Sequence, residues 1–186
     1  HSYGYRPGRS AHDAVAQSQR NCFNHDFVLD LDIQSYFDTI DHELMMKALK
    51  HYGAEKWMPL YIGRWLKADI MTRHERISRV TGTPQGGVIS PLLANLFLHV
   101  VFDGWMDKYH PEKPFERYAD DVVVHCKTEK QAKFVLGQIS KRLQSCKLTL
   151  HPQKTKIVNL RGTSEKKYAK SYDFLGFTIK PNWCEI

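Results

Sequence analysis

The sequence ERYADDVVV, residues 116–124, constrains the fold more than any other part of the chain. A polar approach followed by a β-branched run is typical of a tight turn with a strand leaving it. Asp120 and Asp121 are neighbours at this turn, and adjacent carboxylates repel each other unless a cation or basic group lies between them. A third acid at the end of another strand would complete a site for two divalent metal ions.

The sequence FVLDLDI, residues 27–33, predicts a strand that could supply this third acid. Side chains alternate between the two faces of a strand, so a buried apolar face places Asp30 and Asp32 together on the opposite face. The apolar side chains that share the buried face are Leu29, Leu31 and Ile33. Taken alone, Asp30 and Asp32 also fit an edge strand with solvated acids, and Asp120-Asp121 also fit a simple turn.

Capping residues and apolar spacing locate the other elements. We expect helices over residues 10–20, 43–52, 57–67, 90–100 and 128–143, with Ser10, Asp41, Ser90 and Thr128 as N-caps. Further strands are expected at 147–150, 156–160 and 174–179, and a hairpin or loop at 71–82. This order predicts an α+β fold in which helices pack on one face of a small antiparallel sheet.

Composition narrows the class of protein. The chain has 186 residues, which suits one domain with at most a small appendage, and 42% hydrophobic residues, which is enough for a core. Its net charge of +7 favours a polyanionic partner, most often nucleic acid, although ribosome-like and membrane-surface proteins share such charge. The four cysteines form no CxxC pair, which argues against a zinc site, and no apolar run is long enough to span a membrane.

The sequence Thr83-Pro84-Gln85-Gly86-Gly87 precedes the helix expected from Ser90. A glycine pair lets the backbone approach a ligand closely, and a glutamine side chain can both donate and accept hydrogen bonds. A plain loop before a helix is the alternative interpretation.

Five motifs in order resemble those of reverse transcriptases. They are VLDLDIQSYFDTIDH (28–42), TPQGGVISPLLANLFL (83–98), YADD (118–121), LTLHPQKTKI (148–157) and FLGF (174–177). GYRPGRSAHDAV (4–15) is similar to the segment that precedes the first of them in group II intron-encoded reverse transcriptases, also called maturases. The PQGG…SP form resembles bacterial intron enzymes and differs from the ending typical of diversity-generating retroelements.

The resemblance implies a right-hand polymerase palm with part of the fingers. It divides the chain into a lead-in helix (1–25), palm (26–42), fingers-side helices with a basic loop (43–84) and palm again (85–186). It implies that Asp32, Asp120 and Asp121 hold two Mg²⁺ ions with the Ile33 backbone carbonyl, and Asp30 is the alternative to Asp32. The thumb and maturase domains of the family fall outside these motifs, so we expect a fragment that is weak or inactive alone.

The resemblance also implies roles for residues around these acids. Phe37 would be the steric gate that selects dNTPs over ribonucleotides, with Tyr36 as the alternative, and Gln85 would contact the nucleotide. Lys154 or Lys156 would protonate the leaving pyrophosphate unless both are merely solvated. The sequence Phe174-Leu175-Gly176 would grip the primer, or else form an ordinary buried strand.

The partners implied are an RNA template, a DNA or RNA primer, dNTPs and a group II intron RNA. Arginines that would follow the phosphates, or equally be solvated, are Arg6, Arg9, Arg73, Arg76 and Arg79. The resemblance also implies intron splicing and retrohoming, a bacterial cytoplasmic location and a possible homodimer. Alternatives are a retron-type or CRISPR-associated reverse transcriptase, a non-catalytic RNA-binding splicing module, and a nucleotide cyclase, which would lack the PQGG loop.

Overall fold

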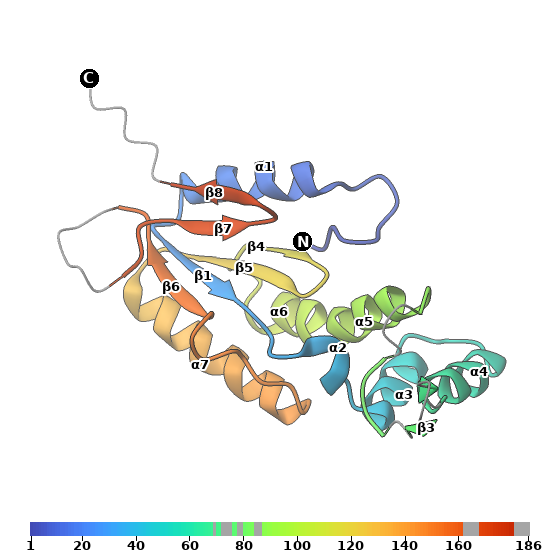
Figure 1. The fold of residues 1–186 in the computed structure, drawn as a ribbon. Helices are drawn as coiled ribbons and strands as arrows, with labels where there is room; N and C mark the ends of the chain where they lie inside the picture. Colours follow the sequence, from blue (N-terminus) through green and yellow to red (C-terminus); the bar gives the residue numbers. More distant parts are fainter. Residues whose placement is uncertain (69, 72–75, 78–79, 84–86, 162–167, 181–186) are drawn as a thin grey trace.

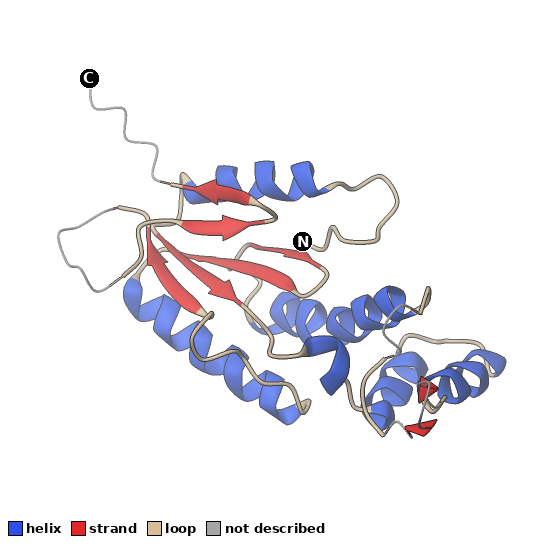
Figure 2. Cartoon of the chain, viewed as in Figure 1, coloured by secondary structure: helices blue, strands red, loops and turns tan. Residues whose placement is uncertain are grey.

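A four-stranded antiparallel sheet with the order β4-β5-β1-β6 forms the centre of the computed structural model (Figure 1). The structure describes residues 1–68, 70–71, 76–77, 80–83, 87–161 and 168–180. The strands are β1 Phe27–Leu31, β4 Phe115–Tyr118, β5 Asp121–Cys126 and β6 Lys156–Asn159. The α+β class and the small antiparallel sheet expected from the sequence are confirmed (Figure 2).

Helices and two short hairpins surround this sheet. The helices are α1 Ala11–Cys22, α2 Tyr36–Thr39, α3 His42–His51, α4 Trp57–Leu66, α5 Ser90–Leu98, α6 Gly104–Tyr109 and α7 Glu129–Ser145. A π-helical segment, His99–Asp103, joins α5 to α6. The hairpins are β2 Ile70–Met71 with β3 Arg76–Ile77, and β7 Tyr172–Phe174 with β8 Phe177–Ile179.

Three of the four expected N-caps are confirmed. The Ser10 hydroxyl accepts from the Asp13 N–H in a capping box. The side chains of Asp41 and Thr128 cap α3 and α7 by accepting from the Leu44 and Gln131 N–H groups. Ser90 was expected to cap α5, and this prediction is wrong. The helix begins at Ser90 itself, with Ile89 in the N-cap position and no side-chain capping bond, because the preceding turn is already right-handed.

Both faces of the sheet are covered by helices, whereas helices were expected on one face only, because α1 packs on the face opposite α7 (Figure 1). Leu29 and Leu31 pack into the larger core with α3, α5 and α7, whereas Val28 and Val123 pack into a second core. In Figure 1, α7 lies on one side of the sheet, and α1 and the β7–β8 hairpin lie on the other. The second face is therefore buried except near Asp30, which is half-buried.

Two of the expected strands differ in the structure. Residues 147–150 form no strand, because Lys147 adopts a left-handed conformation and only Leu150 bridges to Ile33. Residues 174–179 form a hairpin instead of one strand, because Leu175 and Gly176 both have positive φ and reverse the chain. The segment 71–82, expected as a hairpin or loop, overlaps the antiparallel pair of β2 and β3, which begins one residue earlier at Ile70.

Non-strand segments pair with the two outer strands of the sheet. Ser2 bridges Arg117 of β4 in parallel, and the Tyr3 N–H donates to the Arg117 carbonyl at 2.8 Å. On the other side, the Asn159 N–H of β6 donates to the Ala169 carbonyl at 2.9 Å. None of the helices in the described ranges has the length and apolar character that a bilayer crossing requires.

Candidate active site

A polar cavity of about 420 Å³ opens where β1, the β4–β5 turn and the loop before β6 meet. Its lining residues are Asp30, Leu31, Asp32, Ile33, Asp120, Asp121, Lys154, Lys156 and Asp173. The folded chain thus brings together the acids of two motifs that are far apart in the sequence. It adds Asp173, which sequence analysis did not single out.

The β4–β5 turn presents Asp120 at its tip. Tyr118 pairs with Asp121, which leaves Ala119 and Asp120 as a two-residue connection. Ala119 has a φ of 56°, a left-handed conformation that costs about 1–2 kcal/mol for a residue with a Cβ. Gly4 lies against this turn, since a Cβ on Gly4 would lie 2.6 Å from the Ala119 nitrogen.

Arg117 is fully buried directly behind the turn. Its Nε and Nη2 donate to both carboxylate oxygens of Asp103 at 2.6 Å, a bidentate pair. Its Nη1 donates to Asn95 Oδ1 at 2.6 Å and to the Ala119 carbonyl at 2.9 Å. The guanidinium therefore ties the backbone of the turn to α5 and to the π-helical segment.

The five acids of the cavity outnumber its two lysines, so their negative charge is only partly compensated. Burial raises the pKa of Asp30 to about 6, and the nearby charge of Asp173 adds to this despite Lys156. Burial also raises the pKa of Asp121 to about 6, with a further contribution from the neighbouring aspartates. Such mutual repulsion between carboxylates is what a bound cation relieves.

The loop before β6 holds the backbone of Asp32. The His151 N–H donates to the Asp32 carbonyl at 2.8 Å, and the Thr155 hydroxyl lies 3.4 Å from the same oxygen. This anchoring places Lys154 Nζ 3.5 Å from Asp32 Oδ2. Both side chains are substantially exposed, so this ion pair contributes little stability and can exchange for another cation.

The donor set suits Mg²⁺, which prefers carboxylate oxygens and retains waters. Asp32, Asp120 and Asp121 supply such oxygens, and Ile33 lines the same cavity. Within the described ranges, no three His, Cys, Asp or Glu side chains converge as a ready-made metal cluster. The aspartates therefore fit the ion by chemistry and location, and their side chains would have to turn inward to hold it.

Phe37 and Tyr36 occupy different environments. Tyr36 is buried and its hydroxyl donates to the Ala94 carbonyl at 2.5 Å, whereas Phe37 is only half-buried. The Thr83 N–H donates to the Phe37 carbonyl at 2.8 Å, so the segment that leads to residue 84 begins beside Phe37. Gly82 makes this approach possible, because a Cβ there would lie 2.8 Å from the Phe37 carbonyl oxygen.

The turn of the β7–β8 hairpin lies beside Asp121. The Leu175 N–H hydrogen-bonds the Asp121 carboxylate, which opposes the rise in its pKa. Phe174 is fully buried, whereas Gly176 is exposed at the turn. The hairpin therefore places backbone, and not the Phe174 ring, at the rim of the cavity.

Of the five predicted arginines, the two whose side chains the structure describes, Arg6 and Arg9, do not line this cavity. Arg6 and Arg9 are exposed, with Arg6 Nη2 3.3 Å from His99 Nδ1 and the Arg9 guanidinium 5.0 Å from the Tyr3 ring. Arg76 lies in β3, where only its backbone is described. Arg73, Arg79 and Gln85 lie outside the described residues.

The residues that position the acids were not among the site residues predicted from the sequence. Arg117 was interpreted as part of a polar approach to the turn, yet it is buried together with Asp103. A signal was present, because Asn95, His99 and Asp103 are the polar residues of the otherwise apolar stretch of residues 92–103. His151 and Thr155, which hold the Asp32 backbone, lie in a motif from which only lysines were selected.

Comparisons with known proteins agree with this geometry. The chain matches the family described as reverse transcriptase (RNA-dependent DNA polymerase) over residues 1–179. The group II intron-encoded protein LtrA of Lactococcus lactis subsp. cremoris is 36% identical over 98 residues, which cover 53% of this chain and 16% of LtrA. Protein YkfC of Escherichia coli K12 is 29% identical over 195 residues, which cover 84% of this chain and 51% of YkfC.

A solved structure shares the fold. Apo telomerase from Candida tropicalis, truncated from its C-terminal domain, superposes with a TM-score of 0.71 at 14% identity, covering 97% of this chain and 39% of telomerase. The chain spans about half of YkfC and less of LtrA. The family match extends over both acidic motifs and the cavity that they form, and this chain accordingly belongs to the reverse transcriptase (RNA-dependent DNA polymerase) family.

Proposed function

We propose that the polar cavity between β1 and the β4–β5 turn, called the acid-lined cavity below, is the polymerase site of this reverse transcriptase domain. At this site, dNTPs are added to a primer 3′-hydroxyl on an RNA template. The observation that carries the proposal is the meeting of Asp32, Asp120 and Asp121 in one cavity within a domain of this family. Burial raises the pKa of Asp121 and the neighbouring aspartates raise it further, and this supports the proposal because crowded carboxylates attract cations.

Asp32, Asp120 and Asp121, with the Ile33 backbone carbonyl, would hold two Mg²⁺ ions. Bound there, the ions would favour deprotonation of the primer hydroxyl and neutralise the departing phosphates. Lys154 would leave Asp32 and act on the pyrophosphate, because its exposed ammonium already lies at the mouth of the cavity. Lys156 lines the same cavity and remains the alternative donor.

Phe37 is the better candidate for the gate that excludes a 2′-hydroxyl. Its ring is partly accessible, whereas Tyr36 is buried with its hydroxyl already bonded. Thr83 is bonded to the Phe37 backbone, and Gln85 follows only two residues later, which supports a contact of Gln85 with the same nucleotide.

The β7–β8 turn would support the primer near the reacting end. Leu175 and Gly176 would contact the primer through their backbone, and the buried Phe174 would anchor the hairpin beneath them. Residues 1–42 and 85–186 would form the palm with its lead-in helix, and residues 43–84 would belong to the fingers. The basic residues Arg6, Arg9, Arg73, Arg76 and Arg79 would follow the template and primer phosphates.

The similarity to LtrA favours a longer parent protein that serves a group II intron and binds its RNA. The similarity to YkfC keeps other bacterial reverse transcriptases as alternatives. A longer protein that binds intron RNA tightly but extends no primer would instead be a splicing scaffold.

Primer extension on an RNA template with dNTPs and Mg²⁺ tests the proposal, using the protein in its full natural length. We expect Asp120→Asn to abolish extension, because the substitution removes a charged oxygen ligand without changing the side-chain shape. Asp173→Asn is the matched control, since Asp173 lines the same cavity but is assigned no ion. Equal extension by Asp120→Asn and wild type would contradict the assignment.

A further inference from the structure

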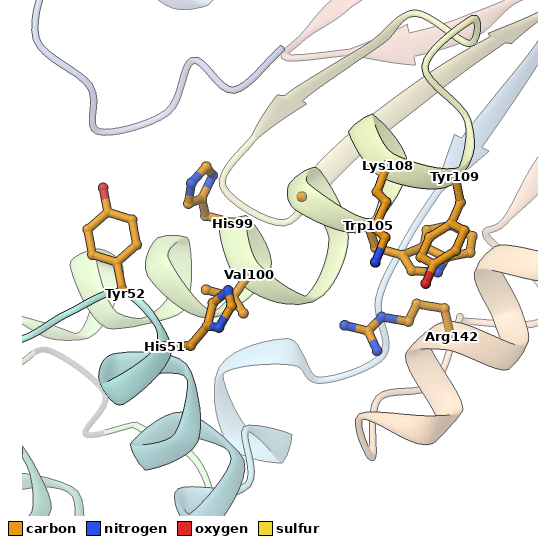
Figure 3. A pocket seen from close by; sticks show the side chains of 9 residues that line it. His51, Tyr52, His99, Val100, Trp105, Lys108, Tyr109 and Arg142 are labelled. Atoms are coloured by element: carbon orange, nitrogen blue, oxygen red, sulfur yellow. The ribbon is translucent and has the colours of Figure 1, made fainter.

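A second cavity, of about 580 Å³, lies among α3, the π-helical segment, α6 and α7 (Figure 3). It shares no lining residue with the acid-lined cavity. The side chains on which the inference depends are Tyr52, His99, Trp105, Lys108, Tyr109 and Arg142. No carboxylate is among the lining residues, so this pocket has the opposite charge to the candidate active site.

Two cations line this pocket. Lys108 extends from α6 and Arg142 from α7, and in Figure 3 the Lys108 side chain reaches toward the Arg142 guanidinium. Neither side chain forms an ion pair with any residue in the described part of the chain. Of the nearby acids, Asp103 pairs with Arg117, and Asp107 lies 3.9 Å from the His1 ring.

The guanidinium of Arg142 is held in place by the π-helical segment. Its Nε donates to the Val101 carbonyl at 3.0 Å, and its two terminal nitrogens have no hydrogen-bond partner among the residues that the structure describes. A guanidinium fixed in this way matches the geometry of a phosphate, and π-helical turns occur frequently at functional sites. Two cations in one pocket without a counter-charge, one of them immobilised, favour a bound anion.

Aromatic rings lie next to these cations. Tyr109 is 58% exposed, and its ring centroid lies 5.9 Å from that of Trp105. Tyr52 is also exposed on the far side of the pocket, against His99. Exposed rings beside a phosphate site are the arrangement with which proteins stack unpaired bases of single-stranded nucleic acids.

We propose that this pocket binds one nucleotide of a single-stranded RNA. Its phosphate lies between Lys108 and Arg142, and its base stacks on Tyr109. The net charge of +7 draws a polyanionic strand to the surface, and the pocket offers both a phosphate site and a stacking surface. This second RNA contact lies outside the polymerase cavity and does not require the polymerase reaction.

The test measures the binding of a short fluorescein-labelled oligouridylate by fluorescence anisotropy. Saturating unlabelled primer–template duplex is present throughout, so that the polymerase cavity cannot capture the probe. The variant Lys108→Gln/Arg142→Gln should bind about 10-fold more weakly, since charge-assisted contacts to one phosphate are lost. The salt dependence of log affinity should also become shallower by about 0.7, the contribution of one phosphate on a single strand.

Two further variants separate the parts of the site. Lys127→Gln/Lys130→Gln removes the same charge near the start of α7, about 18 Å along the helix from Arg142, and should bind like wild type. Tyr109→Ala should weaken binding about 5-fold or more, and Tyr109→Phe should restore it, because stacking needs the ring and not the hydroxyl. A 4-thiouridine probe should crosslink within residues 104–109.

Several results would overturn the proposal. The first is an unchanged affinity in both the double variant and Tyr109→Ala. The second is a crosslink confined to residues of the polymerase cavity. The third is displacement of the probe by uridine monophosphate as strongly as by unlabelled strand. Displacement by a polyglutamate peptide would indicate an acidic protein partner and would equally overturn it. The tyrosine variants keep the test decisive if thermal unfolding shows that the Arg142 variant fails to fold. Extension of a preloaded primer–template should be unchanged in Lys108→Gln, so failure of this site is distinguishable from failure of the polymerase assignment.

Discussion

Replacing Arg117 by methionine should destabilise the protein strongly, because it leaves Asp103 buried without its partner. The Arg117 side chain is 0% exposed and the Asp103 side chain 5% exposed, and two hydrogen bonds of 2.6 Å join them. Burial opposes ionisation of Asp103, but hydrogen bonds to Arg117 and His99 outweigh it and hold its pKa below the usual range. Removing one member of such a buried pair costs about 3–5 kcal/mol.

The substitution should also displace the β4–β5 turn, which carries Asp120. Arg117 Nη1 donates to the Ala119 carbonyl at 2.9 Å, and the conformation of Ala119 is intrinsically unfavourable. Without that bond the turn loses the contact that keeps Asp120 at its tip. We expect primer extension by Arg117→Met to fall even at temperatures where the variant stays folded.

Urea unfolding at neutral pH measures the free energy, and a double-mutant cycle isolates the pair. Asp103→Leu/Arg117→Met should be less destabilised than the sum of its single variants, because no charge is left buried. Arg117→Lys should fall between wild type and Arg117→Met, since an ammonium cannot form the two parallel bonds. A loss below about 1 kcal/mol for Arg117→Met, the value typical of an exposed pair, would refute this reasoning.

Three further predictions concern other parts of the structure. Gly82→Ala should lower the free energy of unfolding by about 2 kcal/mol or more and raise the KM for dNTPs, because the added Cβ meets the backbone of α2 at 2.8 Å and φ is +77°. Gly53→Ala is the control in urea unfolding. It should show the conformational cost alone, because Gly53 has a φ of +79° with open space around it. Phe37→Val should increase incorporation of ribonucleotides relative to dNTPs in single-nucleotide extension, whereas Tyr36→Phe should lose stability without losing selectivity. Burial lowers the pKa of His125, but hydrogen bonds to Cys22 and Glu116 outweigh this and raise it to about 9. The folded state then binds this proton more tightly than the unfolded state, so protonated His125 stabilises the fold. The stabilisation is complete below pH about 6.5 and is lost as pH rises through about 9. His125→Gln should therefore flatten the profile of unfolding free energy against pH over this range.

Structural features that depend on residues close together in the sequence could be predicted from the sequence alone. Ser10, Asp41 and Thr128 act within one helical turn, so their capping roles could be inferred from the sequence. The reversal at Leu175 could not, because a leucine rarely adopts positive φ and the pattern around it fits a straight strand equally well.

The candidate site shows the same division. The acids of the cavity could be inferred from alternation and from motifs, whereas their supports could not. Glu116 and Arg117 look like surface residues in the sequence, but Glu116 is buried against His125 and Arg117 against Asp103. Such pairs join elements distant along the chain, and no local pattern reveals which polar residue will find a buried partner.

The backbone pairing along both outer strands has a consequence for how copies of this protein can meet. Residues 1–3 use hydrogen-bonding positions of β4, and Ala169 uses one of β6. An exposed outer strand is a template for intermolecular sheet extension and aggregation, and here both templates are partly masked by the chain's own flanking segments. A homodimer formed by pairing of these strands would therefore have to displace the flanking segments, and trimming the first four residues should promote association by uncovering β4.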